Sequence, residues 1–461
     1  MAQFNDSILH NAKKLHFVGI GGSGMCPLAE ILHSKGYIIT GSDVNEGDTI
    51  DRIRSLGIKV FMGHKAENVG NADILVHTAA VHEDNPELQY AKQNGIPVIE
   101  RSILLGMVSR KFPKTIAVSG THGKTTTTSM ISQVMLYANV DPTIIIGGKL
   151  PLIESNGRSG KSDILVCEAC EYVDTFLQLT PAVSVILNID ADHLDYFGTL
   201  ENIIKSFRQF ATQTTSTLIV NGDDNNSMKA VKGLDKEIIT FGINNRNGYY
   251  AENIAVSNGS YYNYDIMSGG KKICHIELGV PGKHNILNSL AATATCLNAG
   301  VSPSDIEKYI KTFHGAGRRF EIYGDFNGVT LADDYAHHPH EITATLDAAR
   351  HLTKNKLWAI FQPFTFSRTK TWLNEFAESL SVADHVILAE IMGSRETNIY
   401  NIHSSDIAAK LNNAVCIDAF EDIADYIVKN AHPGDFVITM GGGDIYKAAK
   451  LIRQKYQSLN N

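Results

Sequence analysis

The chain has 461 residues, of which 43% are hydrophobic and 20% are charged, and its formal net charge is −8. This length predicts two to four domains, most simply three, and the composition excludes a disordered chain. The negative charge disfavours nucleic-acid binding, and no run approaches the ~18 apolar residues of a membrane span. The N-terminus lacks an apolar signal core and the six cysteines form no disulfide framework, so we expect a cytoplasmic protein.

The first predicted domain, residues 1–113, alternates strands and helices as a Rossmann-like parallel unit does. Its first strand is followed by a glycine turn and by a helix from Met25 to Ser34. The strands are expected at residues 14–18, 37–43, 58–62, 72–80 and 96–100. The pattern fades near Pro113, where we place the end of this domain.

Two further α/β domains are predicted, a central one at 114–319 and a C-terminal one at 320–461, which gives an α/β protein of three domains. The central domain should resemble a P-loop ATPase with a mixed or parallel sheet, and the C-terminal domain should again be Rossmann-like. Central strands are expected at 115–120, 163–169 and 182–189, then short strands and turns at 240–280 and a helix from His284 to Gly300. C-terminal strands are expected at 328–334, 357–363, 385–391, 414–420 and 435–441.

A first glycine loop, Gly19-Ile20-Gly21-Gly22-Ser23-Gly24, follows the first strand and precedes a helix. Asp43 ends the next strand, at about the ~20-residue distance expected of a ribose-binding acid. Small residues let the backbone approach a pyrophosphate at the positive end of the helix. By itself the motif is typical of a nicotinamide dehydrogenase, or simply of a tight strand–helix junction.

A second loop is more specific for phosphate, and it runs Gly120, Thr121, His122, Gly123, Lys124, Thr125, Thr126. Lys124 can reach β- and γ-phosphates, and the Thr125 hydroxyl can bind Mg²⁺. Val118 stands where the longer P-loop pattern has its first glycine, so this is a shortened phosphate loop. We take Lys124 to be an exposed loop lysine with little packing role. Two phosphate loops argue against a simple dehydrogenase, which needs one nucleotide site.

Acidic residues follow two central strands at the edge where α/β sheets bind ligands. Glu168 follows the first strand, and Asp190, Asp192 and His193 follow the second. Carboxylates there can complete Mg²⁺ coordination, whereas a lone histidine is more often structural. A zinc or redox role for Cys167 and Cys170 is disfavoured because no second cysteine pair accompanies them.

Longer motifs carry a family resemblance over nearly the whole chain, from His16 to Gly443. GTHGKTTTTSM, NIDADHLDYF, GKHNILNSLAA and GAGRRFE together resemble the Mur ligase family of cell-wall enzymes. HFVGIGGSGM, VHEDNPE, EACEY and DDYAHHPHEI resemble the branch that adds L-alanine to UDP-N-acetylmuramate. The resemblance implies ATP-dependent ligation of L-alanine to the lactyl carboxylate through an acyl phosphate, giving UDP-MurNAc-L-alanine, ADP and phosphate. It implies that the successive domains bind the UDP-sugar, ATP and the amino acid.

The same resemblance implies roles for single residues. The UDP-sugar would contact Gly21, Gly22, Ser23 and Asp43. ATP would contact residues 120–126 of the second loop, His284, Asn285, Asn288, Arg319 (or its neighbour Arg318) and, through its ribose, Asp334. The metal, Mg²⁺ or alternatively Mn²⁺, would be held by Thr125, Glu168 and His193. The alanine pocket would contain Tyr335, His337 and Arg368. Lys124, Glu168, His193 and Arg319 would be the catalytic set.

Structural alternatives accompany several of these roles. His284 and Asn285 could cap the helix that follows, residues 337–340 could form a solvated turn or a metal tract, and Arg368 could be a surface cation. The sequence also departs from relatives. Phe364 and Thr365 replace a His and an Arg, EACEYVDTFLQL is less acidic than usual, and Phe207 stands near the position of a carbamylated lysine in some members.

Two other functions remain open at this point. One is the related ligase that attaches a murein tripeptide to UDP-N-acetylmuramate, and the other is a non-catalytic nucleotide-binding relative. For the ligation of L-alanine, the expected partners are UDP-N-acetylmuramate and L-alanine. We expect no nucleic-acid or membrane partner. The protein would be a monomer or homodimer.

Overall fold

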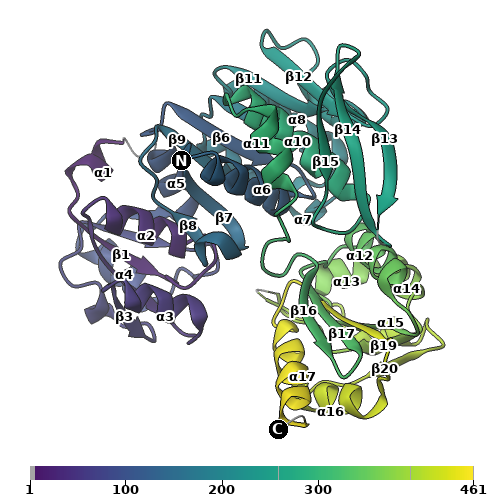
Figure 1. Cartoon of the computed structure of the whole chain (residues 1–461). Coiled ribbons are helices and arrows are strands. Elements are labelled where there is room, and N and C mark those ends of the chain that lie inside the picture. Colours follow the sequence, from purple (N-terminus) through teal and green to yellow (C-terminus); the bar gives the residue numbers. More distant parts are fainter. Residues whose placement is uncertain (1–5, 258, 395, 460–461) are drawn as a thin grey trace. The chain divides into compact units, whose positions relative to one another are not determined.

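The computed structural model describes residues 6–257, 259–394 and 396–459, and these form three sheets with helices around them (Figure 1). The α/β class and the three domains are confirmed. Residues 1–5 and 460–461, at the ends of the first and third predicted domains, lie outside the described residues. The chain divides into two compact units. The first extends to Tyr250 and includes Ile266–Cys274 and Leu287–Tyr309, and the second contains 251–265, 275–286 and the chain from Ile310 onward.

The first sheet has the strand order β3-β2-β1-β4-β5, and every neighbouring pair is parallel. The order reverses between β1 and β4, which is the switch point where such sheets bind ligands. The N-cap Asn85 and Pro86 start α4, since the Asn85 side chain accepts the N–H of Glu87 at 2.9 Å. The strands are β1 (Lys14–Val18), β2 (Ile38–Asp43), β3 (Lys59–Met62), β4 (Ile74–His77) and β5 (Val98–Glu100). The helices are α1 (Ser7–Asn11), α2 (Cys26–Ser34), α3 (Asp48–Ser55), η1 (Ala66–Asn68), α4 (Pro86–Gln93) and α5 (Arg101–Ser109).

The central sheet has the order β15-β14-β13-β12-β11-β10-β6-β9-β7-β8. Strand β6 lies between β10 and β9 and is parallel to both, whereas β8 is antiparallel to β7. The strands are β6 (Lys114–Ser119), β7 (Thr143–Leu150), β8 (Ser155–Arg158), β9 (Ile164–Glu168), β10 (Val183–Ile186), β11 (Thr217–Asn221), β12 (Glu237–Gly242), β13 (Tyr249–Ser257), β14 (Tyr261–Ser268) and β15 (Lys271–Glu277). The helices are α6 (Lys124–Tyr137), η2 (Pro151–Ile153), η3 (Tyr172–Gln178), α7 (Leu194–Phe197), α8 (Leu200–Gln213), α9 (Asn225–Val231), α10 (His284–Asn298) and α11 (Pro303–Ile310).

One apolar core runs through the first unit, because it contains Phe17 and Val76 of the first sheet together with Ala117 and Leu165 of the central sheet. Strands β1, β6 and β9 of these sheets are buried almost throughout, as expected for parallel strands covered on both faces. The first two domains therefore share a core within one compact unit.

The third sheet has the order β16-β17-β21-β18-β19-β20, with only the edge pair β16–β17 antiparallel among the described strands. Alternate residues of its strands pack into two cores, one with α12 and α14 and one with α16 and α17. The strands are β16 (Glu321–Phe326), β17 (Val329–Asp334), β18 (Leu357–Phe361), β19 (His385–Leu388), β20 (Ala414–Cys416) and β21 (Phe436–Met440). The helices are α12 (Pro339–Leu352), α13 (Phe366–Thr371), α14 (Leu373–Leu380), α15 (Ser404–Ala408), α16 (Phe420–Asn430) and α17 (Tyr446–Leu459).

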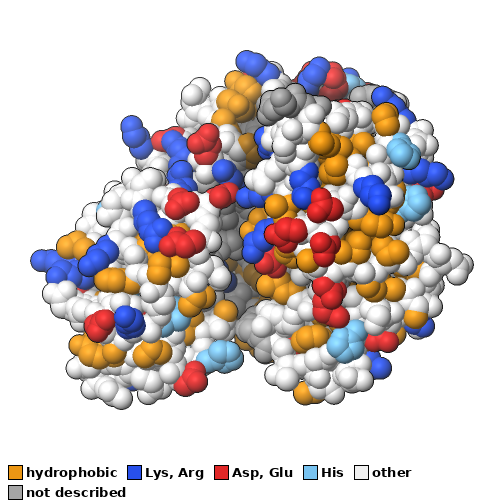
Figure 2. All heavy atoms as spheres, turned by 90° about the horizontal axis from the view of Figure 1, so that it is seen from below, with side chains coloured by type: hydrophobic (Ala, Val, Ile, Leu, Met, Phe, Trp, Pro, Cys, Tyr) orange, Lys and Arg blue, Asp and Glu red, His pale blue; other side chains and the backbone are white. Residues whose placement is uncertain are grey.

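The surface agrees with the charge pattern of the sequence. On the face shown in Figure 2, Lys and Arg side chains are interspersed with Asp and Glu, and the face carries no continuous basic stripe. Within the described ranges, no helix is both long and apolar enough to cross a membrane.

Candidate active site

The second glycine loop connects β6 to α6, and its backbone requires glycine at two positions. Gly120 and Gly123 have φ angles of +142° and +87°, which L side chains rarely adopt. A Cβ at position 123 would also collide with the side-chain amide of Asn288. The structure therefore brings Asn288, one of the predicted ATP contacts, directly onto the phosphate loop.

The segment that follows β10 holds this loop through hydrogen bonds that each pair a side chain with a backbone group. The N–H of His122 donates to Oδ1 of Asn188 at 2.8 Å, and Nδ2 of Asn188 donates back to the His122 carbonyl at 3.0 Å. The N–H of Asp190 donates to Oγ1 of Thr121 at 2.9 Å. Asn188 was not among the predicted site residues, although it begins the quoted NIDADHLDYF motif. The Asn188 amide hydrogen-bonds both the N–H and the carbonyl of His122, and these two bonds fix the backbone path of the loop.

The environment of Lys124 differs from our expectation of an exposed lysine. Its side chain is only 16% exposed, and Nζ lies 2.9 Å and 3.1 Å from the two carboxylate oxygens of Glu171. Although burial alone lowers the pKa of Lys124, the adjacent Glu171 carboxylate raises that pKa above its ordinary value. Lys124 is therefore a largely buried, charged group, and the expectation of an exposed lysine with little packing role was wrong.

The three predicted metal ligands follow three neighbouring strands. Thr125 is the second residue of α6 after β6, Glu168 ends β9, and His193 precedes α7 after β10. Because β10, β6 and β9 are adjacent and parallel, these residues lie at one edge of the sheet. Oε1 of Glu168 accepts the Gly147 N–H at 2.6 Å, which orients the carboxylate. The Thr125 hydroxyl and the Glu168 carboxylate are oxygen donors of the kind that Mg²⁺ and Mn²⁺ prefer, whereas the His193 imidazole is an unusual ligand for a hard cation.

Position 207 excludes the carbamylated lysine that some family members use. The Phe207 side chain is fully buried, with its ring 5.1 Å from that of Phe176, whereas Lys205 on the same helix is exposed. We therefore expect Lys205→Ala to retain most of the ligase activity, measured as ADP release with and without bicarbonate. A large loss of activity in the variant would contradict this, if bicarbonate stimulates the parent protein but not the variant.

The first glycine loop is tied to the end of β2. Oδ2 of Asp43 accepts the Gly21 N–H at 2.9 Å, and Oδ1 accepts the N–H groups of Val44 and Asn45 at 2.8 and 3.0 Å. Gly22 and Ser23 are exposed on the loop. The structure thus brings Gly21 and Asp43 together, and Asp43 closes the turn in addition to its predicted contact with the UDP-sugar.

We expect Gly22→Val to weaken UDP-N-acetylmuramate binding at least ~10-fold and to change ATP binding little. A Cβ at position 22 would lie 3.3 Å from the Gly19 carbonyl oxygen, so the loop must shift, and added methyl groups would obstruct a diphosphate. Calorimetric titration of both ligands checks this, with Gly22→Ala as the milder control. Equal weakening of the two ligands would argue against separate sites.

Arg101 is a basic residue of this region that the sequence analysis missed. A Cβ built on Gly24 would lie 3.0 Å from Cδ and 3.1 Å from Nη1 of Arg101, so the arginine covers the glycine loop. Burial raises the pKa of the Cys170 thiol, and Lys124 and Arg101 both oppose that rise. Arg101 therefore lies against the first glycine loop, and its charge also reaches Cys170 after β9. Its position at the start of α5, a helix that the sequence analysis did not place, gave no signal for this.

In the second unit, the structure distinguishes Arg318 from Arg319. Arg318 donates to Asp333 at 3.0 Å and to the carbonyls of Gly443 and Gly441 at 2.8 and 2.7 Å. Burial raises the pKa of Asp333 to about 6, and Arg318 opposes this rise. The guanidinium groups of both arginines lie near the Tyr335 ring, at 5.0 Å for Arg318 and 4.9 Å for Arg319, but that of Arg318 is already hydrogen-bonded to the interior of its own domain. This favours Arg319 as the phosphate-binding arginine.

Asp334 already serves the backbone. Its two oxygens accept the N–H groups of Phe320 and Ala336, each at 2.6 Å, and the residue is buried. Burial raises the pKa of Asp334, which the Arg319 charge and these hydrogen bonds oppose. A contact of Asp334 with the ATP ribose stays a prediction.

The predicted alanine pocket is partly assembled. The Tyr335 and His337 rings are 5.2 Å apart, and the Phe364 ring is 6.2 Å from that of His337. Arg368 lies half-buried on α13 after β18, and β18 and β17 flank β21 in parallel, so their carboxyl ends share one edge. Phe364, one of the departures from the family pattern, therefore lies beside His337 in the predicted pocket.

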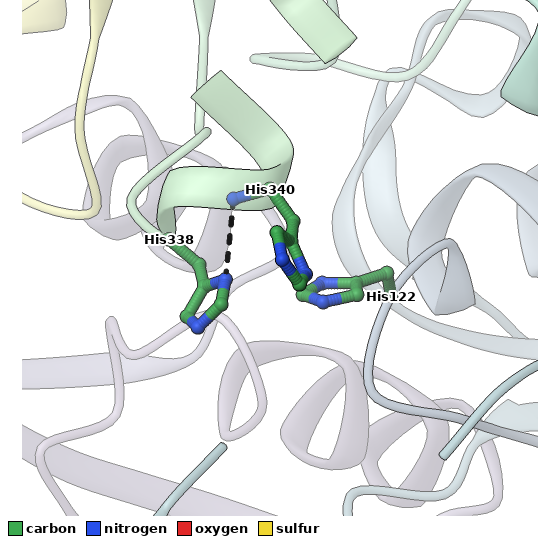
Figure 3. A group of neighbouring side chains, drawn as sticks. All are labelled: His122, His338 and His340. Carbon is green, nitrogen blue, oxygen red and sulfur yellow. Dashed lines mark hydrogen bonds between the residues drawn. The ribbon is translucent and has the colours of Figure 1, made fainter. Parts of the chain in front are cut away.

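Structural roles account for some of the predicted residues. His338 is the N-cap of α12: its Nδ1 accepts the His340 N–H at 3.4 Å (Figure 3), and the Glu341 side chain accepts the His338 N–H. Nδ2 of Asn285 donates to the Pro281 carbonyl at 2.7 Å, so this amide holds the turn before α10. His284 and Asn288 are one turn apart and share a face of α10.

Three family domains match the chain in order. Residues 14–113 match the Mur ligase family, catalytic domain, residues 118–296 the Mur ligase middle domain, and residues 318–443 the Mur ligase, glutamate ligase domain. With the phosphate loop and the acids of the central sheet, these matches define the class. The protein belongs to the Mur ligase family.

Individual relatives narrow the comparison. The chain is 44% identical over 448 residues to the UDP-N-acetylmuramate–L-alanine ligase of Caldanaerobacter subterraneus subsp. tengcongensis, covering 96% of this chain and 97% of the relative. It is 44% identical over 452 residues to the enzyme of that name from Acetivibrio thermocellus, covering 96% of each. The solved UDP-N-acetylmuramate-alanine ligase of Thermotoga maritima is similar with a TM-score of 0.84 and 28% identity, over 96% of this chain and 99% of that chain. A murein peptide ligase from Psychrobacter arcticus has a TM-score of 0.76 and 25% identity, over 96% and 98%.

Proposed function

We propose that this protein is an ATP-dependent ligase that joins L-alanine to the lactyl carboxylate of UDP-N-acetylmuramate in peptidoglycan precursor synthesis. The observation that carries the chemistry is the phosphate loop, with Lys124 and Thr125 opening α6 between the strand ends that bear Glu168 and His193. The choice of alanine rests on the 44% identity to ligases of that name.

In the proposed reaction, the lactyl carboxylate attacks the γ-phosphorus of ATP, ADP leaves, and an acyl phosphate forms. The alanine amine then attacks the acyl carbon and phosphate leaves, so no protein nucleophile is required. Lys124 supplies positive charge to the transferred phosphoryl group, which is what phosphoryl transfer mainly needs. Thr125, Glu168 and His193 would hold Mg²⁺ or Mn²⁺, which neutralises phosphate charge when bound.

We further propose that Arg101 takes an anionic group of UDP-N-acetylmuramate. A guanidinium over a glycine loop suits a phosphate or carboxylate, because its fork can donate two parallel hydrogen bonds. Arg101 lies against Gly24 of the loop proposed for the diphosphate, and its charge reaches Cys170, two residues after Glu168. It could therefore orient either the diphosphate or the lactyl carboxylate.

The second candidate is ligation of a murein tripeptide, because the chain is also similar to the murein peptide ligase of Psychrobacter arcticus. ADP release with UDP-N-acetylmuramate and either L-alanine or the tripeptide separates the two. We expect release with alanine, and release with the tripeptide alone would reverse the assignment.

A further inference from the structure

The ion pair between Lys124 and Glu171 lies inside the proposed phosphate site. Nζ of Lys124 is 2.9 Å from Oε2 and 3.1 Å from Oε1 of Glu171, and it also donates to the carbonyls of Gly120 and Thr121. The Glu171 side chain is only 3% exposed. An ammonium has three hydrogens to donate, so protein groups satisfy Lys124 completely in this state.

Glu171 stands on a backbone segment that its own contacts hold in place. The Cys170 carbonyl accepts the Phe176 N–H at 2.9 Å and the Thr175 hydroxyl at 2.8 Å. Val173 and Asp174 have φ angles of +53° and +56°, a region that a β-branched residue such as valine rarely occupies. Such strain persists only where the surroundings determine the conformation.

The side chains of the same segment reach other groups of the site. Asp174 accepts the Tyr196 hydroxyl at 2.8 Å and also the Ser206 hydroxyl, which ties the segment to α7 and α8. The Tyr172 ring is 4.5 Å from the His193 ring. Residues 171–174 therefore contact the phosphate-loop lysine and the predicted metal histidine from one short turn.

We propose that Glu171 is a positioning residue for Lys124: it holds the ammonium in the phosphate loop before ATP binds and gives it up to the γ-phosphate when ATP arrives. This inference rests on the proposed function of the loop. The carboxylate and the γ-phosphate are both anions that need the same ammonium. Glu171 therefore weakens the binding of ATP while keeping the lysine aimed at the place of phosphoryl transfer.

The test is calorimetric titration of Glu171→Gln with a non-hydrolysable ATP analogue and with ADP. The neutral amide no longer competes for Lys124, so we expect the analogue to bind 5- to 10-fold more tightly than to the parent. ADP, which lacks the γ-phosphate, should gain less than the analogue. The KM for ATP should fall while kcat does not rise. A role limited to folding would lower the melting temperature without tightening the analogue selectively.

Two controls make the test specific. In a Lys124→Ala background, Glu171→Gln should no longer tighten the analogue through Lys124, because the ammonium for which the carboxylate and the γ-phosphate compete is gone. Asp174→Asn disturbs the same segment without touching Lys124, so it should not tighten the analogue. If Glu171→Gln does not fold, Glu171→Asp withdraws the carboxylate by one methylene and should give a smaller gain of the same sign.

Unchanged or weaker analogue binding in the folded variant, or an equal gain for ADP, would overturn the inference. Failure of the parent protein to bind ATP at all would instead refute the proposed function. Because the readout is binding, neither result depends on which amino acid is ligated.

Discussion

Replacing Lys124 with alanine should lower ADP formation by about 10³-fold, the scale on which enzymes lose rate when one group that stabilises developing charge is removed. The ammonium opens α6 and is the basic group of the phosphate loop that can reach β- and γ-phosphates. The measurement is the steady-state rate of ADP release at saturating UDP-N-acetylmuramate and L-alanine. Near-normal turnover would remove Lys124 from the catalytic set.

The fold of this variant needs its own control, because Glu171 would lose its buried partner. Removing one member of a buried ion pair costs ~3–5 kcal/mol of stability. We expect Lys124→Ala to unfold at a lower temperature than the parent, and Lys124→Ala with Glu171→Gln to recover most of that loss. The double variant should be stable and still inactive, which separates the chemical role of the lysine from its structural one.

Replacing Arg368 with lysine should raise the KM for L-alanine ~10- to 100-fold and leave UDP-N-acetylmuramate and ATP binding nearly unchanged. A guanidinium can hold a carboxylate through two parallel hydrogen bonds, a geometry that a lysine loses. Thr365 supplies no second cation, so the carboxylate depends on Arg368. Initial rates over a range of alanine concentrations measure the effect.

Arg350→Lys is the matched control for this variant. Arg350 donates to Asp384 at 2.7 Å and has no predicted role in the pocket, so the same substitution there should leave the alanine KM unchanged. Unaltered alanine saturation in Arg368→Lys, or loss of nucleotide binding instead, would place Arg368 in another site.

The parallel strands of the first and third sheets were predicted, because each is a short apolar run bounded by a turn. In the central sheet β6, β9 and β10 were predicted, but the parallel strands β7 and β11 were missed although both are apolar runs. Two further missed strands lie where the apolar signal is weak. Strand β16 alternates polar and apolar residues, and the Asn327-Gly328 turn that joins it to β17, with φ of +55° and +81°, is a recognisable hairpin signal that we did not use. Strand β8 reads Ser-Asn-Gly-Arg, which has no strand propensity, and depends on pairing with β7.

The site could be predicted where local spacing carries the chemistry, as it does for Lys124 and Thr125 in the phosphate loop. Glu171 and Asn188 were missed because their roles depend on tertiary contacts. Glu171 is 47 positions from Lys124, and Asn188 is 66 from His122. The burial of Lys124 was likewise invisible in the sequence, since a loop lysine next to glycines is normally exposed.

The central claim is that this chain activates UDP-N-acetylmuramate with ATP for attack by L-alanine. The most direct test is ADP release by the purified full-length protein with UDP-N-acetylmuramate, ATP and Mg²⁺, against a panel of amino acids and the murein tripeptide. We predict that L-alanine stimulates ADP release most strongly and that the product is UDP-MurNAc-L-alanine. ADP release that no amino acid stimulates, or that only the tripeptide stimulates, would contradict the account.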